Sequence, residues 1–192
     1  MLTIDWAQFT KHGLRLKGKK SSMTVGVFDG IHRGHQALIE KVTTHAKKNG
    51  YMPVIITFRS NFKTGETSGG IYTFKEKIKK FKQMGVKITV VIDFTESFSR
   101  MTGIEFLQLL LKHGNVGFFA VGSNFRCGYQ LDTDAAAIQK FFTTQRIPVE
   151  IAPEVMEENL PISSSRIRVA IAQGNLTLAE KMLGRTLKPP FN

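Results

Sequence analysis

Two histidines lie three residues apart in a glycine-spaced stretch near the start of the chain. The stretch reads GVFDGIHRGH over residues 26–35, with His32 and His35 in its second half. It follows a strand-like run and precedes a helical pattern, so it predicts a turn from the carboxyl end of a buried parallel strand into a helix. A turn in that place is typical of sites that handle nucleotides.

The imidazole N–H groups of His32 and His35 suit the binding of phosphate oxygens. The two rings lie about one helical turn apart, at a helix start whose free N–H groups and dipole favour an anion. Gly26, Gly30 and Gly34 let the backbone turn tightly and approach a ligand closely. The expected chemistry is nucleotidyl transfer, because this reaction needs no protein nucleophile and depends on positioning the phosphates and neutralising their charge.

Two other interpretations of this turn stay open. Asp29 together with the two histidines would make a metal-binding triad suited to zinc. The histidines would otherwise be ordinary surface residues of a strand-to-helix turn.

A run of three serines near the end of the chain predicts a second anion site. Ser163 or Ser164 is the expected N-cap of an amphipathic helix, and Arg168 lies one turn inside that helix. The hydroxyl groups and the planar guanidinium can reach a β- or γ-phosphate. An ordinary capped helix with an exposed arginine is the alternative, and the His32 and His35 turn favours the anion site, because transfer needs a second group on the departing pyrophosphate.

The stretch 26–35 resembles the G-x-F-D-G-x-H-x-G-H signature of the FMN adenylyltransferase module of bacterial FAD synthetases, a branch of the HxGH nucleotidyltransferases. Three later segments resemble further motifs of this family in the same order: 121–128 resembles V-G-x-D/N-F-x-F-G, 162–168 resembles I-S-S-T-x-I-R, and 183–185 resembles L-G-R. The resemblance runs from about residue 24 to residue 185.

This resemblance implies an enzyme that transfers AMP from ATP to FMN, with Mg²⁺ accompanying the ATP, and that releases FAD and pyrophosphate. It implies catalytic roles for His32, His35 and Arg168. The implied ATP contacts are Gly26, Phe28, Asp29, Gly30, Gly34, Ser163, Ser164 and Ser165, and the implied flavin contacts are Phe58, Phe62, Asn124 and Phe125. No residue is predicted to bind a metal, and Asp29 is expected to order the turn or a metal-bound water rather than to act as a base. Other acceptors, such as phosphopantetheine or nicotinamide mononucleotide, and a noncatalytic nucleotide- or RNA-binding protein are the alternative functions.

The sequence departs from the family pattern in three places. Segment 57–62 lacks the histidine and prolines of T-F-x-P-H-P, and segment 127–131 begins with Cys127 where phenylalanine is common. Both departures lie on the flavin side, so altered flavin selectivity is expected. Bifunctional relatives continue into a riboflavin kinase barrel after L-G-R, so a single FMN adenylyltransferase-like domain over residues 1–192, without a riboflavin kinase domain, is expected here.

The charge of the chain indicates anionic partners. Its 192 residues fit one domain, and 27 basic against 15 acidic side chains give a net charge of +12. ATP, FMN and pyrophosphate fit this charge, and nucleic acid is the less favoured alternative for the basic clusters at 15–20 and 75–82. The second cluster is expected to be mainly a solvated helix face. A single cysteine and the lack of a signal-like or membrane-spanning apolar run indicate a reducing cytoplasm and no membrane role.

Alternating extended and helical patterns predict an α/β fold, a Rossmann-like parallel sheet with helices on both faces as in the HxGH nucleotidyltransferases. Strands are expected at 23–28, 53–58, 88–94, 117–121 and 149–152, and helices at 35–48, 74–84, 103–113, 134–144, 164–172 and 176–183. Capping boxes are expected at Thr73 and Thr102, and helix ends at Gly50, Gly85 and Gly114. Segment 59–71 is predicted to be a mobile lid. Ligands are expected beyond the carboxyl ends of the strands, where the His32 and His35 turn and the Gly122 loop would both emerge.

Overall fold

A six-stranded parallel sheet forms the centre of the protein. The computed structural model describes residues 1–59 and 71–187. The strands are β1 (Leu2–Asp5), β2 (Ser21–Val25), β3 (Met52–Phe58), β4 (Ile88–Ile92), β5 (Val116–Gly122) and β8 (Val149–Ala152). Their order is β1-β4-β3-β2-β5-β8, and every neighbouring pair is parallel. The chain adds β3 and β4 on one side of β2 and then crosses to place β5 and β8 on its other side. The order of strand addition therefore reverses between β2 and β5.

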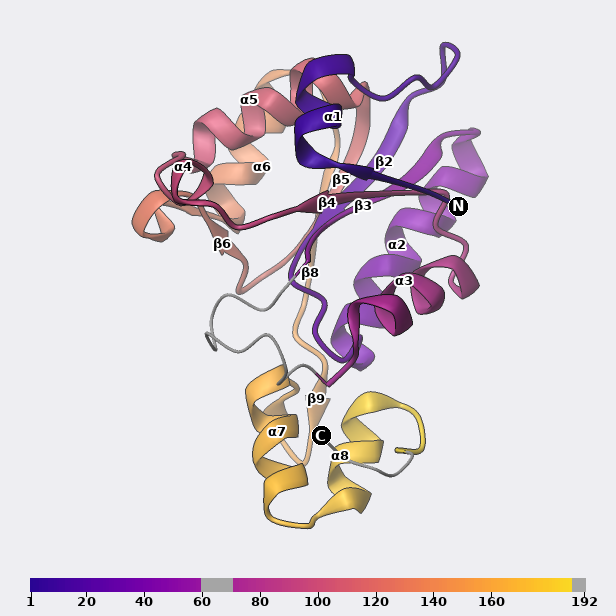
Figure 1. The fold of residues 1–192 in the computed structure, drawn as a ribbon, viewed down its shortest axis with the longest axis vertical. Coiled ribbons are helices and arrows are strands. Elements are labelled where there is room, and N and C mark those ends of the chain that lie inside the picture. Colours follow the sequence, from indigo (N-terminus) through magenta and orange to yellow (C-terminus); the bar gives the residue numbers. More distant parts are fainter. Residues whose placement is uncertain (60–70, 188–192) are drawn as a thin grey trace.

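Helices cover both faces of the sheet, as the sequence predicted (Figure 1). One face carries α1 (Trp6–His12), α4 (Glu96–Ser99), α5 (Gly103–Gly114) and α6 (Ala135–Thr144). The other carries α2 (Arg33–Asn49) and α3 (Phe74–Gln83). Side chains of β3 alternate between the two cores: Val54 and Ile56 pack on the first face, and Ile55 packs on the second. Burial on both faces explains why the strands read as continuous apolar runs.

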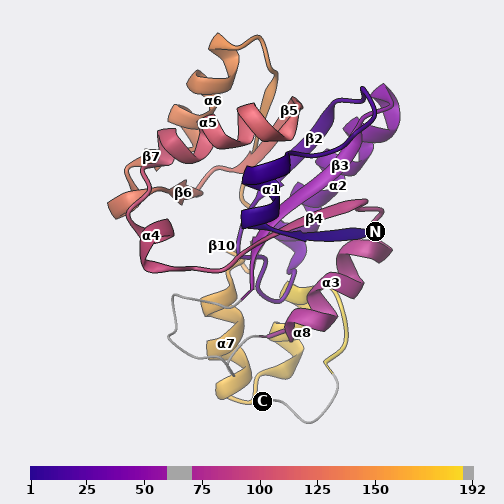
Figure 2. The same cartoon turned by 45° about the horizontal axis from the view of Figure 1, so that its top comes forward.

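A smaller unit follows the sheet and lies beyond the carboxyl ends of its central strands (Figures 1 and 2). It consists of the hairpin β9 (Met156–Glu157) and β10 (Leu160–Pro161), followed by α7 (Ser164–Ala172) and α8 (Leu176–Leu183). Ile167, Met182 and Leu183 form part of a separate small core between the two helices. A second short hairpin, β6 (Arg126–Cys127) and β7 (Thr133–Asp134), flanks the 3-10 turn at Tyr129–Leu131.

The strand before the histidine turn is displaced from its predicted position at 23–28. β2 begins at Ser21 because the polar residues Ser21 and Ser22 are fully buried, and the Ser21 hydroxyl donates to the carbonyl of Gly114 at 2.7 Å. β2 ends before Phe28, whose φ of 53° lies in the left-handed region. The next helix begins at Arg33 rather than at His35, so both histidines lie at its first turn.

Local signals marked most helix ends correctly. Both capping boxes are present, at Thr73 with Glu76 and at Thr102 with Glu105. The prediction for Gly114 is wrong: α5 runs through it, and Asn115 takes the left-handed conformation. A Cβ on Gly114 would lie 2.5 Å from Met23 Cε, so the glycine is needed for packing rather than for the turn. The predicted lid at 59–71 falls almost entirely outside the described residues.

Candidate active site

The turn between β2 and α2 has the tight geometry expected of a glycine-spaced anion site. Phe28, Gly30 and Ile31 all have positive φ, at 53°, 71° and 42°. A Cβ at Gly30 would lie 3.0 to 3.1 Å from the side chain of Ile71, so both the conformation and the close approach require glycine there. The turn delivers His32 to the N-cap position of α2.

His32 and His35 lie face to face at this helix start. Their ring centroids are 3.7 Å apart with an interplanar angle of 21°. The backbone N–H of His35 donates to Nδ1 of His32 at 3.4 Å, so a neutral His32 carries its proton on Nε2. The edge of Phe28 supports the His35 ring from the other side. The pair is therefore held by the turn itself rather than by a carboxylate.

Both imidazoles are neutral at physiological pH. Burial lowers the pKa of His32 to about 4. Burial, and then the nearby His32 and Lys77, hold the pKa of His35 well below its ordinary value. Each neutral ring keeps one N–H group, on Nε2 in His32, that can donate a hydrogen bond to an anion.

Asp29 joins this turn to the distant helix α7. Its carboxylate forms a hydrogen-bonded ion pair with Arg168 and accepts a bond from the backbone N–H of Ile71 at 2.9 Å. Its carbonyl accepts a bond from the Ser164 hydroxyl at 3.0 Å. The two predicted anion sites are therefore in direct contact, although 139 residues separate Asp29 from Arg168.

Further bonds fix the start of α2 against the C-terminal unit. Gln36 donates from one amide nitrogen to the carbonyls of Ile31 and Leu183, both at 2.8 Å. Arg33 pairs with Glu157 at 2.5 Å. Arg168 Nε and His35 Nδ1 are buried and have no hydrogen-bond partner among the described residues. Unsatisfied buried nitrogens are rare in folded proteins and point to a functional site.

The zinc interpretation finds no support in this geometry. Nδ1 of His32 accepts a backbone bond and Asp29 holds Arg168, so two of the three expected ligands are already engaged. Among residues 1–59 and 71–187 no group of three His, Cys, Asp or Glu side chains is arranged to hold a metal ion.

The three serines differ in what they contact. Ser163 is the N-cap, and its hydroxyl accepts from the backbone N–H of Arg166 at 3.2 Å. Ser164 bonds to the histidine turn, as described above, and Ser165 is exposed. The prediction of an N-cap at Ser163 or Ser164 is confirmed.

Lys77 belongs to the site although the sequence assigned it to a solvated face. Its side chain is 6% exposed, and its ammonium donates to the carbonyl of Phe58 at 2.7 Å and to that of Val27 at 3.2 Å. The other lysines of the cluster, at 75, 79, 80 and 82, are exposed or half-buried. One signal in the sequence marks Lys77: it lies three residues after Phe74 and four before Phe81, on the apolar stripe of α3.

The sequence from the histidine turn to the serine run matches a known family. The family model described as FAD synthetase matches residues 15–166. The chain belongs to the FAD synthetase family. The matched residues include the histidine turn, the Gly122 loop and the serine run.

Relatives in the FAD synthetase family are longer than this chain. The bifunctional riboflavin kinase/FMN adenylyltransferase of Escherichia coli K12 is 31% identical over 84% of this chain and 53% of its own length. The Buchnera aphidicola (Schizaphis graminum) protein of the same name is 29% identical over 91% of this chain and 58% of its own. The chain thus spans somewhat more than half the length of these relatives.

A solved structure shares the fold. The crystal structure of a macrolide-efflux protein from Streptococcus pneumoniae matches with a TM-score of 0.82 and 30% identity, over 96% of this chain and 60% of that one. The match covers the sheet and the C-terminal unit alike. In the parts of this chain that the structure describes, no helix is both long and apolar enough to cross a membrane.

The implied flavin contacts of this FAD synthetase family member differ in burial and in position. Phe58 is 8% exposed and packs in the core against the rings of Phe94 and Phe98. Phe94, two residues after the end of β4, is 42% exposed and was not singled out in the sequence. Phe62 lies outside the described residues.

The loop after β5 carries the other two implied flavin contacts. Asn124 is exposed and its amide bonds to Glu154, and Phe125 is half-buried against the main core. Burial raises the pKa of the half-buried Cys127 thiol to about 12, so this residue is a packing group rather than a reactive one.

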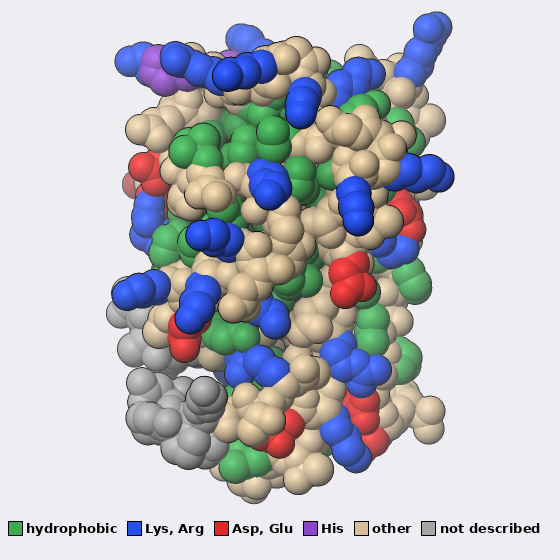
Figure 3. Space-filling model, turned by 90° about the vertical axis from the view of Figure 1, so that its right-hand side faces the viewer, with side chains coloured by type: hydrophobic (Ala, Val, Ile, Leu, Met, Phe, Trp, Pro, Cys, Tyr) green, Lys and Arg blue, Asp and Glu red, His purple; other side chains and the backbone are tan. Residues whose placement is uncertain are grey.

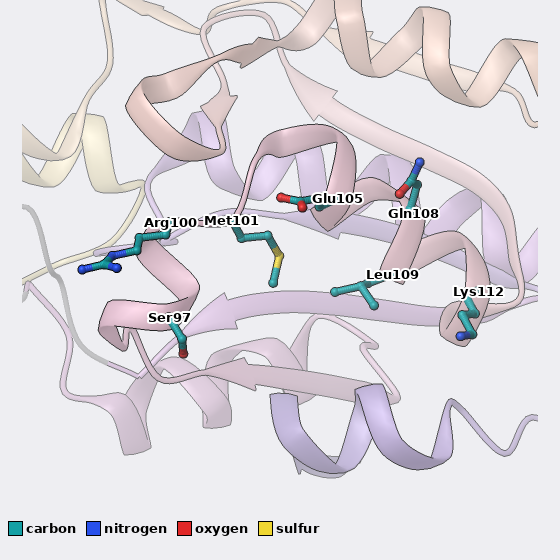
Figure 4. Close-up of a pocket in the computed structure, with 7 residues that line it drawn as sticks. All are labelled: Ser97, Arg100, Met101, Glu105, Gln108, Leu109 and Lys112. Atoms are coloured by element: carbon teal, nitrogen blue, oxygen red, sulfur yellow. The ribbon is translucent and has the colours of Figure 1, made fainter.

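One described cavity lies away from the histidines. It measures about 550 Å³ and is lined by α4 and α5, with Arg100, Glu105 and Lys112 among its lining side chains (Figure 4). None of the predicted site residues lines it.

Proposed function

We propose that this chain transfers AMP from ATP to FMN, giving FAD and pyrophosphate. A phosphate oxygen of FMN bonds to the α-phosphorus of ATP, and the bond from that phosphorus to the oxygen bridging the α- and β-phosphates breaks. The observation that carries the proposal is the neutral, stacked histidine pair joined to Arg168 through Asp29, in a member of the FAD synthetase family. The names of the relatives include this activity.

Different residues are proposed to contact the transferred α-phosphate and the departing pyrophosphate. His32, with its proton on Nε2, and His35 donate hydrogen bonds to the transferring and departing phosphates, whose negative charge grows in the transition state. Arg168, oriented by Asp29, holds the leaving pyrophosphate. Ser163, Ser164 and the first turn of α7 lie beside it and secure the triphosphate.

Asp29 acts as a positioning residue in this proposal. Its carboxylate already holds Arg168 and the backbone of Ile71, so it is poorly placed to accept a proton from substrate. No base is required, because a phosphate monoester is largely ionised near neutral pH, with a second pKa of about 6.

Magnesium enters this proposal as part of the substrate. The described residues offer no carboxylate cage for it, and Mg²⁺ is usually held by substrate phosphates with few protein ligands. No step assigned to the residues above passes through the metal.

The flavin side is proposed to lie at the carboxyl edge between β4 and the loop after β5. Phe94 is an exposed ring of its aromatic cluster and can stack on the isoalloxazine, and Asn124 and Phe125 would contact the flavin from the loop after β5. Phe58 supports Phe94 from the core, and Phe62 keeps its implied role only as a prediction.

The proposal is limited to the adenylyl transfer. Riboflavin kinase activity, which the relatives also have by name, is not proposed for residues 1–192, which we treat as one nucleotidyltransferase domain. A single cysteine with an inert thiol suits a reducing cytoplasm, which we propose as the compartment. ATP and FMN are the proposed partners, and nucleic acid is not.

One assay separates the candidate functions. Purified protein is incubated with ATP, Mg²⁺ and, in separate reactions, FMN, phosphopantetheine or nicotinamide mononucleotide, and the products are weighed by mass spectrometry. FAD formation with release of one pyrophosphate per FAD is expected. A different dinucleotide would reassign the acceptor, and ATP binding without any pyrophosphate release would make the chain a noncatalytic nucleotide binder.

A further inference from the structure

Lys77 lies among the contacts of the proposed site but has no role in the transfer described above. The capping box at Thr73 and Glu76 fixes where α3 begins, which places Lys77 one turn inside the helix. Phe74 and Phe81 occupy the neighbouring turns of the same stripe, and Phe81 is fully buried. The helix therefore inserts a charged side chain at a position that normally holds an apolar one.

The ammonium of Lys77 joins two strand ends at the site. It bonds to the carbonyl of Val27, directly before the left-handed Phe28, and to the carbonyl of Phe58, the last residue of β3. These carbonyls lie at the carboxyl edge of adjacent parallel strands. The contact holds the backbone that leads into the histidine turn.

The charges around Lys77 do not balance. Lys77 and Arg168 are cations, Asp29 is the carboxylate between them, and His32 and His35 are neutral. Asp29 is already paired with Arg168, and burying an ammonium is costly unless its charge is compensated. Arg59, another cation near Lys77, is already held by Asp5 and Asp93. Lys77, Arg168 and Asp29 together thus have one positive charge in excess close to His35, and a polyphosphate is the anion that would compensate it.

We propose that Lys77 is a positioning residue for polyphosphate binding: its ammonium fixes the Val27 carbonyl, and with it the histidine turn, and supplies the uncompensated positive charge that attracts the triphosphate to His32 and His35. This inference rests on the proposed function, which it deepens. It assigns a role to α3, an element that carries none of the recognised motifs.

The charge on Lys77 gives the proposal a pH dependence. Burial lowers the pKa of Lys77 to about 8, against which Asp29 acts to raise it. The charged and titratable groups near it are Asp29 in the turn, His35 on α2, and Arg59 after β3. The Arg59 guanidinium and the Lys77 ammonium both lie over the Phe74 ring, at 5.3 and 5.6 Å from its centroid. As pH rises through about 8 the ammonium is lost, so kcat/KM for ATP should fall.

The test compares Lys77→Met, which keeps the length and removes the charge, with Lys77→Arg, which keeps the charge. Lys75→Met on the exposed face of the same helix is the matched control. For Lys77→Met we expect at least a tenfold loss of kcat/KM for MgATP, mostly through a higher KM. The pH profile of kcat/KM should lose its descending limb near pH 8. The pKa of His35, measured by proton NMR titration, should rise. Lys77→Arg should recover most of the ATP affinity and move the limb to higher pH.

Three results would overturn the proposal: unchanged kcat/KM in Lys77→Met, a descending limb near pH 8 that persists in that variant, or an equal loss in Lys75→Met. If Lys77→Met does not fold, the pH profiles of the wild type and of Lys77→Arg test the proposal instead. A wild-type kcat/KM that is flat from pH 7 to 9 would reject the role of the Lys77 charge. Calorimetry of inorganic tripolyphosphate with Mg²⁺ tests the same site without any acceptor. Tripolyphosphate binding that weakens tenfold in Lys77→Met supports Lys77 even when no FAD is made, and binding unchanged by the substitution rejects it.

Discussion

The ring of His35 is held on both sides by other aromatic rings. Phe28 and His32 hold its ring, and burial keeps it uncharged. Replacing His35 with alanine is expected to lower turnover by about 10²-fold, as losing one preorganised transition-state donor does. Single-turnover FAD formation measures this, and His12→Ala, on the exposed surface of α1, is the control.

His32 needs a different substitution because its ring also caps α2. His32→Ala would remove the cap as well as the donor, whereas His32→Asn can keep the cap. His32→Asn should fold normally and still lose about 10²-fold in turnover. Near-native turnover in His32→Asn or in His35→Ala would show that the role assigned to that histidine is wrong.

Arg168 presents its guanidinium to the site through the carboxylate of Asp29. Arg168→Lys keeps the charge but loses the planar fork, so it should raise the KM for ATP about tenfold or more while leaving FMN affinity unchanged. Flavin fluorescence titration and pyrophosphate release measure the two affinities, and the exposed Arg100→Lys serves as control. Equal weakening of both ligands would instead make Arg168 a residue that only holds the fold.

At the scale of elements, α5 carries the hairpin β6–β7 and so supports the loop with Asn124 and Phe125. Gly103, the first residue of α5, is buried, and a Cβ there would lie 2.2 Å from Oγ1 of the buried Thr133 in β7. Gly103→Ala is expected to lower the free energy of unfolding by about 1–3 kcal/mol through overpacking. Urea unfolding measures the loss. Gly122→Ala, where nothing lies within 4 Å of the added carbon, should cost much less, and equal effects would contradict the packing argument.

The elements that could be predicted are those with local signals. The capping boxes located α3 and α5, and the left-handed Gly50 located the end of α2. Strand β1 and helix α1 were missed because the four residues of β1 are mostly exposed and extended only through pairing with β4. The start of β2 was missed because its serines are buried by partners far away in the sequence, which no local pattern records.

The site was predictable in its motifs but not in its connections. The histidine turn and the serine run were both recognised, yet nothing in their spacing indicated that Asp29 and Ser164 would bond them together. The helical spacing of Phe74, Ile78 and Phe81 correctly indicated the apolar stripe of α3. Lys77 lies inside that stripe, but it was grouped with the exposed lysines around it and so was predicted to face solvent.

For the whole molecule, the neutral histidine pair predicts acid sensitivity. The pKa of His32 falls from its ordinary value of 6.5 in the unfolded chain to about 4 in the folded protein, and that of His35 is also lowered. The unfolded chain therefore binds more protons between these values, so the free energy of unfolding should fall as pH drops from about 6.5 to 4. Urea midpoints at several pH values measure this slope. His32→Asn should show a shallower slope, and an identical slope in both proteins would contradict the assignment.

The basic surface of the molecule is expected to be separate from catalysis. Lysine and arginine side chains gather at the upper end of the face in Figure 3, and the loop with Lys17, Lys19 and Lys20 lies at the corresponding end in Figure 1, opposite the C-terminal unit. Replacing these three lysines with glutamate should leave FAD synthesis within about twofold, because screening by 0.15 M salt limits exposed charges to about 8 Å. RNA affinity should be weak and steeply salt-dependent in the wild type. Loss of FAD synthesis by a folded triple variant would place this loop in the site.

The bonds from Asp29 to Arg168, from Gln36 to Leu183 and from Arg33 to Glu157 bridge 139, 147 and 124 residues. A ribosome delivers the histidine turn more than 120 residues before these partners, so the turn emerges well before the contacts that complete the site. Contacts of such sequence separation also form late in folding, because closing a long loop is costly. A nascent chain that has reached β3 but not Arg168 therefore carries the histidine turn without the ion pair that links it to α7.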